Sequence, residues 1–250
     1  MTRSRNDLST PCPNKSKMPR KEKIRELFDD IAADYDKLNH ILSFGTDRIW
    51  RRRAARALKK GISAEKLLDV AGGTGDFAIE LAKRIPEAGT ICCLDLSEKM
   101  LEVAAVKIAR LGLSKRIECR QGDCESLPYA DGSFDGVSVG FGVRNFEHLE
   151  KGISEMCRVL REGGRLVILE LSYPDNTLLN ACFRFYARRI LPSIGGRVSG
   201  NRGAYDYLPA SILAFPKQDV MLPLLGRCGF RKAVHKAFCF GVCRMYIAEK

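Results

Sequence analysis

From residue 66 to residue 171, short apolar segments alternate with segments whose apolar residues recur at helical spacing. This alternation is typical of βαβ units and predicts a parallel sheet covered by helices. The predicted strands are LLDVAGG, TICCLDL, RIECRQGD, FDGVSVGF and RLVILEL. The predicted helices cover residues 76–84, 98–111 and 149–160. After Gly229, RKAVHKAFCF and CRMYIAEK predict an antiparallel hairpin at the sheet edge, so we expect an α/β domain with a mostly parallel, seven-stranded sheet.

The remaining segments are expected to surround this sheet. Residues 1–21 are basic and poor in apolar side chains, which predicts a disordered and dispensable tail. Residues 22–250 are predicted to form a single domain. Its parts are a helical N-terminal cap (22–60), the sheet core (61–171), a helical insertion after the fifth strand (172–216), and the last helix with the hairpin (217–250). Because α/β sheets bind ligands at the carboxyl ends of their strands, the cap and the insertion are assigned to the substrate.

The charge balance favours an anionic partner. Lys and Arg number 42 against 30 Asp and Glu, a net charge of +12. About half of the excess lies in the tail, and the remainder clusters at residues 48–60 and 184–202. Neither cluster is interleaved with aromatic residues that stack on bases, so we expect no nucleic-acid partner. No apolar segment is long enough to span a bilayer, and no secretory signal is recognisable, so a cytoplasmic location is expected.

Cysteines are numerous but do not form a metal-binding pattern. The chain has ten of them, and no CxxC motif occurs. In a protein that is not exported, scattered cysteines behave mostly as small buried hydrophobic residues. We therefore expect no metal and no disulfide.

A glycine-rich turn follows the first predicted strand in the segment Asp69–Asp76, DVAGGTGD. At such a turn backbone amides and the positive end of the next helix face a bound ligand, and glycine lets the backbone come close. Asp95 ends the second predicted strand twenty residues after Gly75, which is the spacing of an acid that binds ribose in dinucleotide folds. This motif alone does not separate NAD from S-adenosylmethionine.

The third predicted strand adds a second acid, in Asp123-Cys124-Glu125. With it the chain resembles a class I S-adenosylmethionine-dependent methyltransferase, which has a Rossmann-like fold. The resemblance implies that Gly73, Thr74 and Gly75 lie under the methionine part of the cofactor. It implies that Asp95 accepts hydrogen bonds from the ribose hydroxyls, that Asp123 accepts one from the adenine amine, and that the amide of Cys124 donates to the adenine ring. The alternative is that both aspartates only cap strand ends.

Three further signatures narrow the resemblance to the UbiE/MenG family of quinone-biosynthesis C-methyltransferases. The first consists of Phe28, Ala32, Tyr35-Asp36, Asn39, Ser43-Phe44-Gly45 and Trp50; the second is FGVRN at 141–145; the third is YDYLPASILAFP at 205–216. The family methylates a ring carbon of a reduced, prenylated quinone, and the likeness is greatest to demethylmenaquinone methyltransferases. The chain departs from the family at Gly140, a cofactor position where relatives often carry Ser.

The resemblance also implies catalytic positions. Removal of a phenolic proton makes the ring carbon nucleophilic, and a cation or a hydrogen-bond donor near the oxygen stabilises the phenolate. Arg144 and Asn145 are the predicted residues for this role, and Tyr35 is predicted to orient the ring or pass the proton. The alternatives are a surface salt bridge for Arg144, a turn residue for Asn145 and a packing aromatic for Tyr35. His148 is expected at a helix start on the surface, without a partner.

A prenylated hydroquinone has to be drawn from a membrane, so transient contact with the membrane surface is expected. One stripe of a predicted helix is apolar, at Leu178, Cys182, Tyr186 and Ile190, and Asn180, Arg184 and Arg188 lie opposite. This pattern suits either an interfacial helix or a lid packed on the sheet. Homo-oligomerisation is left open. The competing functions are an S-adenosylmethionine-dependent methyltransferase that acts on RNA or on another small molecule and, more remotely, a NAD-binding regulator.

Overall fold

The sheet contains the seven predicted strands, and their order gives the site its position. The computed structural model describes residues 21–186 and 202–250; the predicted tail apart from Lys21, and Arg188 and Ile190 of the predicted stripe, lie outside them. The strands are β1 (Lys66–Val70), β2 (Thr90–Asp95), β3 (Ile117–Gln121), β4 (Phe134–Gly140), β5 (Leu160–Leu171), β6 (Lys232–Phe238) and β7 (Cys243–Glu249). Their order in the sheet is β3-β2-β1-β4-β5-β7-β6.

Strands β1 to β5 pair in parallel, and the hairpin completes the sheet. β7 pairs antiparallel with both β5 and β6, so β6 forms the edge. The mostly parallel sheet with a terminal hairpin is therefore confirmed. Leu94 of β2 pairs with Val70 of β1 and Asp95 pairs with Gln121 of β3, so these strands end at a common edge. The order reverses at β1, between β2 and β4, where ligands bind in doubly wound folds.

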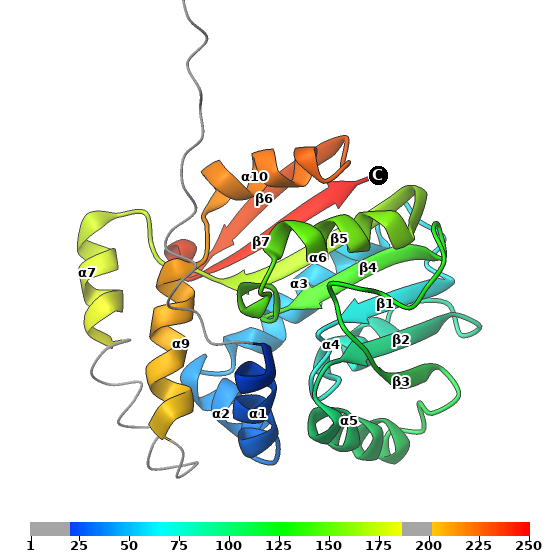
Figure 1. The fold of residues 1–250 in the computed structure, drawn as a ribbon, viewed down its shortest axis with the longest axis horizontal. Helices are drawn as coiled ribbons and strands as arrows, with labels where there is room; N and C mark the ends of the chain where they lie inside the picture. The colour runs from blue at the N-terminus through cyan, green and yellow to red at the C-terminus, as the bar shows by residue number, and fades with distance from the viewer. Residues whose placement is uncertain (1–20, 187–201) are drawn as a thin grey trace, which may run out of the picture.

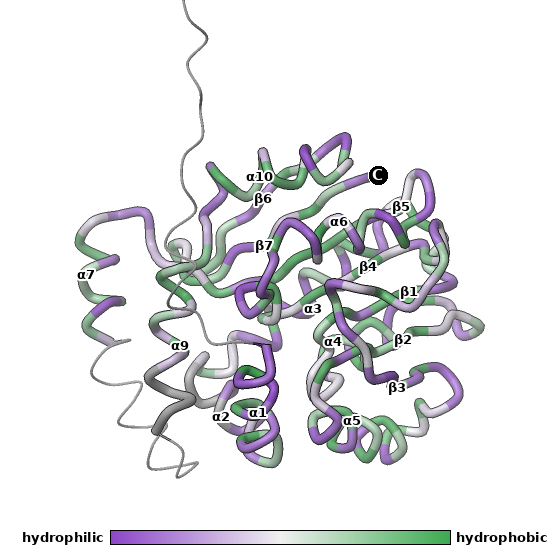
Figure 2. Tube along the Cα trace, viewed as in Figure 1, coloured by the Kyte–Doolittle hydropathy of each residue, from purple (hydrophilic) through white to green (hydrophobic). Residues whose placement is uncertain are grey.

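Helices cover both faces of the sheet. α3 (Thr46–Lys59), α4 (Asp76–Ala82) and α5 (Glu98–Arg110) pack on one face. α6 (Leu149–Val159) and α10 (Gln218–Arg227) pack on the other, in front of the strands in Figure 1. The central strands are largely hydrophobic (Figure 2), as expected for a sheet buried on both faces.

The remaining helices lie near the carboxyl ends of the parallel strands (Figure 1). They are α1 (Lys21–Ile31), α2 (Tyr35–Leu42), α7 (Thr177–Phe185), α9 (Arg202–Ala214) and the 3-10 turns η2 (Val143–Asn145) and η4 (Cys239–Gly241). The segments predicted as cap and insertion are thus helical where they are described, and α1 packs against α5 and α9. Within the described part of the chain no helix is both long and apolar enough to cross a membrane.

Candidate active site

The turn after β1 brings backbone close to an open space. Gly73 has a φ of +55°, and a Cβ placed there would meet no atom within 4 Å. Gly75 begins α4 with a φ of +79°, and a Cβ there would lie 3.1 Å from the Cβ of Ala104. Glycine is therefore required at Gly75 both for its left-handed backbone and for the close packing of α4 on α5.

Asp95 at the end of β2 is fixed by the backbone around it. Its Oδ2 accepts a hydrogen bond from the Gly73 amide at 2.8 Å, and its Oδ1 accepts one from the Ser97 amide at 2.8 Å. Burial raises the pKa of Asp95, and these amide donors oppose the change. Since each carboxylate oxygen accepts more than one hydrogen bond, Asp95 retains lone pairs for a ligand.

Asp123, after β3, is held by the chain on both sides. Its Oδ1 accepts a hydrogen bond from the Glu125 amide at 2.8 Å, and its Oδ2 forms an ion pair with Lys21 of α1. Partial burial raises the pKa of Asp123, but the Lys21 ammonium and the Glu125 amide outweigh it and lower the pKa overall. The carboxylate is thus ionised and already faces a cation in this structure.

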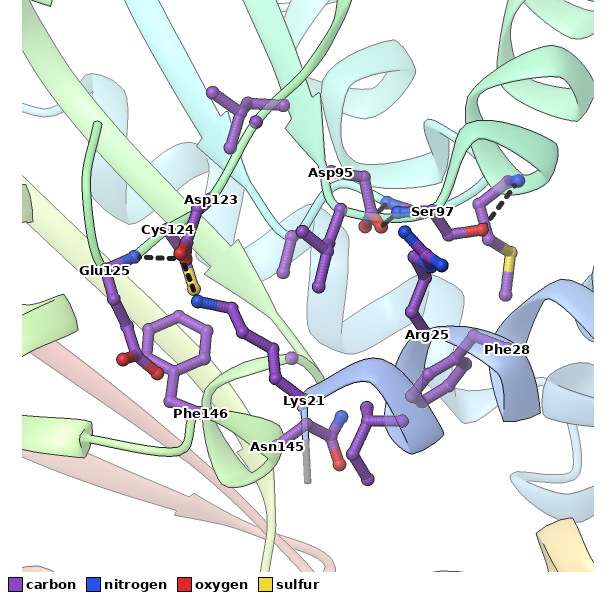
Figure 3. Close-up of a pocket in the computed structure, with 18 of the residues that line it drawn as sticks. Lys21, Arg25, Phe28, Asp95, Ser97, Asp123, Cys124, Glu125, Asn145 and Phe146 are labelled. Atoms are coloured by element: carbon purple, nitrogen blue, oxygen red, sulfur yellow. Dashed lines mark hydrogen bonds and ion pairs between the residues drawn. The ribbon is translucent and has the colours of Figure 1, made fainter. Parts of the chain in front are cut away.

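A cavity of about 720 Å³, the first cavity, lies between these acids and α1. Gly73, Asp95, Asp123 and Cys124 line it from the sheet. Figure 3 shows Lys21, Arg25 and Phe28 of α1 on the opposite side, with Arg25 between Phe28 and Asp95. The structure therefore brings the two predicted acids, the glycine turn and a helix from the N-terminal cap together around one cavity.

Three predicted cofactor residues lie outside the lining of the first cavity. Thr74 is buried, and its hydroxyl donates to Asp36 of α2. Gly75 is the residue at the start of α4 described above. Gly140 faces Phe77, and a Cβ there would come within 2.8 Å of the ring, so a larger residue would require Phe77 to move. These three residues shape the turn and the strand end without reaching the cavity.

A second cavity, of about 1120 Å³, lies beside the first. Its walls are largely apolar, from Trp50, Phe141, Leu171, Phe183, Leu208 and Ile212. Phe141 lines both cavities and therefore stands between them. Arg144 supplies a charged group to the wall of the second cavity.

Arg144 is buried and paired. Its Nη1 donates to Oε1 of Glu170 at 2.7 Å, and its backbone amide donates to Oε2 of the same carboxylate at 3.1 Å. The surface salt bridge considered as an alternative is therefore wrong, since Glu170 is fully buried in β5. The Nε atom is also buried and has no hydrogen-bond partner among the described residues. Burial lowers the pKa of Arg144, but Glu170 and two nearby tyrosines outweigh it, so the guanidinium stays charged.

Asn145 and Tyr35 lie next to Arg144 and line the first cavity. The Tyr207 hydroxyl of α9 donates to Oδ1 of Asn145 at 2.9 Å. Tyr35 begins α2 and packs edge-on against Phe28 with ring centroids 6.0 Å apart. Burial raises the pKa of Tyr35, and the Arg144 charge opposes the change. The η2 turn thus places Arg144 at the second cavity and Asn145 at the first, so the predicted catalytic residues meet where the cavities adjoin.

His148 differs from its prediction. Its Nδ1 lies 2.9 Å from Oε2 of Glu125, and its backbone amide donates to Oε1 at 3.0 Å. The expectation that His148 has no partner is therefore wrong. Glu125 lies 23 residues earlier in sequence, on the loop after β3, and the periodicity around His148 gives no sign of it.

One group of side chains has the composition of a metal site. His40, Asp47 and Asp76 have potential ligand atoms within 4.8 Å of one another. Arg51 forms ion pairs with both aspartates, at 3.5 Å to Asp76. Because Arg51 already pairs with both aspartates, an ion-pair network accounts for this partly buried cluster.

In comparisons with known proteins, both the sequence and the structure match methyltransferases. A model of the ubiE/COQ5 methyltransferase family matches residues 16–250. The chain is 44% identical over 229 residues to the demethylmenaquinone methyltransferase of Bacteroides fragilis (strain ATCC 25285), covering 92% of this chain and 93% of the relative. It is also 44% identical over 229 residues to the ubiquinone/menaquinone biosynthesis C-methyltransferase UbiE of Geobacter sulfurreducens, covering 92% and 89%.

A solved structure supports the fold. The SAM-dependent methyltransferase, possible histamine N-methyltransferase, of Thermotoga maritima aligns with a TM-score of 0.63 at 16% identity. The alignment covers 90% of this chain and 99% of the other. The predicted class I methyltransferase fold is therefore confirmed.

Proposed function

The chain belongs to the ubiE/COQ5 methyltransferase family, and from this premise we propose that the first cavity binds S-adenosylmethionine and the second binds a reduced, prenylated quinone. The protein is an S-adenosylmethionine-dependent methyltransferase of menaquinone or ubiquinone biosynthesis. We propose demethylmenaquinol as the substrate, with the benzoquinol of ubiquinone biosynthesis as the alternative. Among its relatives, the name of the Bacteroides protein specifies the first and that of the Geobacter protein allows both.

The residues around the first cavity fit the cofactor. In the proposal Asp95 accepts hydrogen bonds from the ribose hydroxyls, and Asp123 accepts one from the adenine amine while it shares its carboxylate with Lys21. Gly73 leaves open space for the methionine part beside the turn. Charge-assisted hydrogen bonds to the two carboxylates make these contacts strong ones. The cofactor supplies an electrophilic methyl group on its sulfonium.

Arg144 and Asn145 are proposed to stabilise the phenolate of the substrate. A phenol has a pKa near 10, so the neutral hydroquinone is a weak nucleophile at neutral pH. A buried guanidinium beside the phenol oxygen lowers the pKa of that phenol. The attraction between the two groups grows as negative charge develops on the oxygen. The Nε of Arg144 supports this role, because it is a buried donor without a partner among the described residues and an incoming oxygen would provide one.

Tyr35 is proposed to orient the ring. Burial raises its pKa above the ordinary phenol value, so its hydroxyl is protonated at neutral pH and acts as a donor. Glu170 is proposed to position Arg144, since it bonds both the guanidinium and the backbone of η2. Phe141 separates the cavities and would set the approach of the methyl group to the ring carbon.

The second cavity and α7 are proposed to guide the prenyl tail. Phe183 and Tyr186 line the cavity, whereas Leu178 and Phe185 of α7 are exposed. No residue of α7 is buried, so the predicted alternative of a lid packed on the sheet does not describe this helix. Exposed apolar side chains beside an apolar cavity suit an enzyme that takes its substrate from a bilayer. We therefore propose a cytoplasmic protein that associates peripherally with the membrane.

The observation that carries the proposal is the meeting of the two cavities at residues 141–145. The test is an analysis of quinones from cells that lack the gene, with and without a plasmid copy. We expect the deletion strain to accumulate a quinone that lacks the ring methyl group, and the plasmid to restore the methylated quinone. Normal quinones in the deletion strain would contradict the proposal, and the ring type of the accumulated compound identifies the substrate.

A further inference from the structure

The outward side of α3 is mostly cationic, with Ile49 as its one large exposed apolar residue. Its exposed cations, here called the α3 basic face, are Arg48, Arg52, Arg53, Arg56, Lys59 and the following Lys60. On the opposite side Trp50, Ala54 and Leu58 are buried against the sheet. Among the described residues only Glu80, 3.8 Å from Arg52, forms an ion pair with this face. The charge of the α3 basic face is therefore mostly uncompensated within the described part of the protein.

Two phenylalanines stand exposed near this helix. Phe44, in the turn before α3, is 84% exposed, and Phe240, in η4, is 81% exposed. Both have left-handed backbone conformations, with φ of +52° and +57°. Bulky residues rarely adopt this conformation, and large apolar side chains are rarely exposed together in a monomer. Two tight loops thus project aromatic rings away from the protein.

The start of α3 and the two loops that carry these rings lie at the second cavity. Phe44 and Cys239, the neighbour of Phe240, both line that cavity, and so do Thr46 and Trp50 of α3. The guanidinium of Arg53 lies 5.5 Å from the centroid of the Phe238 ring, which connects α3 to the strand before η4. In Figure 1, α3 crosses the sheet on the side away from the viewer, beginning next to α2. The two loops and the first turn of α3 therefore adjoin the second cavity, and the basic face extends from that turn along the rest of the helix.

We propose that the α3 basic face together with Phe44 and Phe240 docks on an anionic lipid bilayer. The inference rests on the proposed function, because only a substrate held in a membrane requires the cavity mouth to face one. Cations attract anionic headgroups, and the aromatic rings insert at the boundary between headgroups and acyl chains. A membrane accounts for both the charge and the apolar rim of a deep cavity, whereas a nucleic acid would account for the charge alone.

Vesicle sedimentation with purified full-length protein tests the charge. We expect wild type to bind vesicles of phosphatidylcholine mixed with phosphatidylglycerol, to bind pure phosphatidylcholine weakly, and to be released by salt. Arg48→Glu/Arg56→Glu should bind the anionic vesicles at least about tenfold more weakly, because each cation near an anionic surface contributes substantially. The matched control Arg110→Glu/Lys115→Glu makes the same change of charge at exposed residues by α5 and should bind as wild type does.

A second variant tests the aromatic rings. Phe240→Asn removes the ring while keeping a residue that tolerates the left-handed backbone, so the fold is retained. It should weaken vesicle binding severalfold, while Leu111→Asn, which removes an exposed apolar residue at the end of α5, should not. Melting temperatures of all variants confirm that they are folded.

Turnover on a short-tailed quinol without vesicles separates this inference from the proposed function. All these variants should turn over as wild type does, because none of the altered residues lines either of the two cavities. Wild-type vesicle binding by Arg48→Glu/Arg56→Glu, or tighter binding of wild type to an oligonucleotide than to anionic vesicles, would overturn the docking surface. Vesicle binding without any quinol methylation would instead overturn the proposed function.

Discussion

Arg144 is buried and bonded to Glu170, so its replacement by alanine would change both the stability of the fold and the chemistry. Arg144→Ala would leave Glu170 buried without its partner, which typically destabilises a protein by about 3–5 kcal/mol. Arg144→Lys keeps a cation for Glu170 and changes only the planar array of donors. The conservative substitution is therefore the informative one.

We predict that Arg144→Lys lowers turnover by about ten- to a hundredfold while the affinity for S-adenosylmethionine stays unchanged, because the contact strengthens only as phenolate charge develops. Steady-state kinetics, calorimetry and thermal melting on one preparation measure all three. Arg158→Lys, which alters an arginine paired with Glu155 and Asp131 away from both cavities, serves as the control. Normal turnover by folded Arg144→Lys would remove the guanidinium geometry from the mechanism.

Asp95 supplies a prediction about the cofactor. Asp95→Asn keeps the shape of the side chain but removes its charge and one acceptor, so the Gly73 amide and the ribose both lose a partner. We expect the dissociation constant for S-adenosylmethionine to rise by about ten- to a hundredfold. Calorimetry measures it, with Glu118→Gln on the exposed side of β3 as the control. An unchanged dissociation constant would show that ribose binds elsewhere.

Asp69 supplies a prediction about pH. Burial raises its pKa from 3.8 to about 7, although the Ser138 hydroxyl, 2.6 Å from Oδ1, opposes the change. At a pH between these two pKa values, Asp69 is protonated in the folded protein and ionised in the unfolded chain. The stabilisation of the folded state by this proton is complete below the lower pKa and is lost as the pH rises through the upper pKa.

Urea unfolding of wild type and Asp69→Asn at a series of pH values isolates this group, because other titrating groups cancel in the difference. We expect the free energy of unfolding of wild type to fall relative to that of Asp69→Asn between about pH 4 and pH 7. Parallel curves would show that Asp69 is ionised in the folded state.

At the scale of elements, α9 lines the second cavity and also donates one hydrogen bond to η2. Tyr207 donates to Asn145, which fixes the amide on η2. Tyr207→Phe should lower turnover about fivefold, since a single hydrogen bond contributes roughly 1 kcal/mol, and should leave cofactor affinity unchanged. Tyr129→Phe, which loses a hydroxyl contact with Cys92 away from both cavities, is the control. Equal turnover in the two variants would exclude a positioning role for α9.

Elements were predictable where they repeat a pattern. Alternating apolar segments predicted β1 to β5 and α4 to α6, with ends that differ by a few residues, because burial on two faces requires continuous apolar strands. The same logic placed Asp95 and Asp123 at one sheet edge. Glu170 was not predicted as a site residue, because an acid near the end of the apolar segment RLVILEL looks like an ordinary residue at the end of a strand. Lys21 was missed because its ion pair with Asp123 spans 102 residues and leaves no local signal.

At the scale of the whole molecule, the cations of one predicted basic cluster have two different roles. Of the two predicted basic clusters, residues 48–60 contain the α3 basic face, while Arg51 of the same helix is buried with Asp47. Sequence alone could not separate these two uses, because helical periodicity becomes informative only when the packing partner is known. The sheet supplies that partner and leaves the remaining cations facing outward along the length of α3.

The central claim is the transfer of a methyl group to a ring carbon, and one measurement tests it most directly. Purified protein is incubated with S-adenosylmethionine labelled in the methyl group and with reduced, short-tailed demethylmenaquinol, and the product is analysed by NMR. The account predicts the label on the ring carbon that carried hydrogen in the substrate. A label on oxygen, or no product from protein that binds the cofactor, would contradict it.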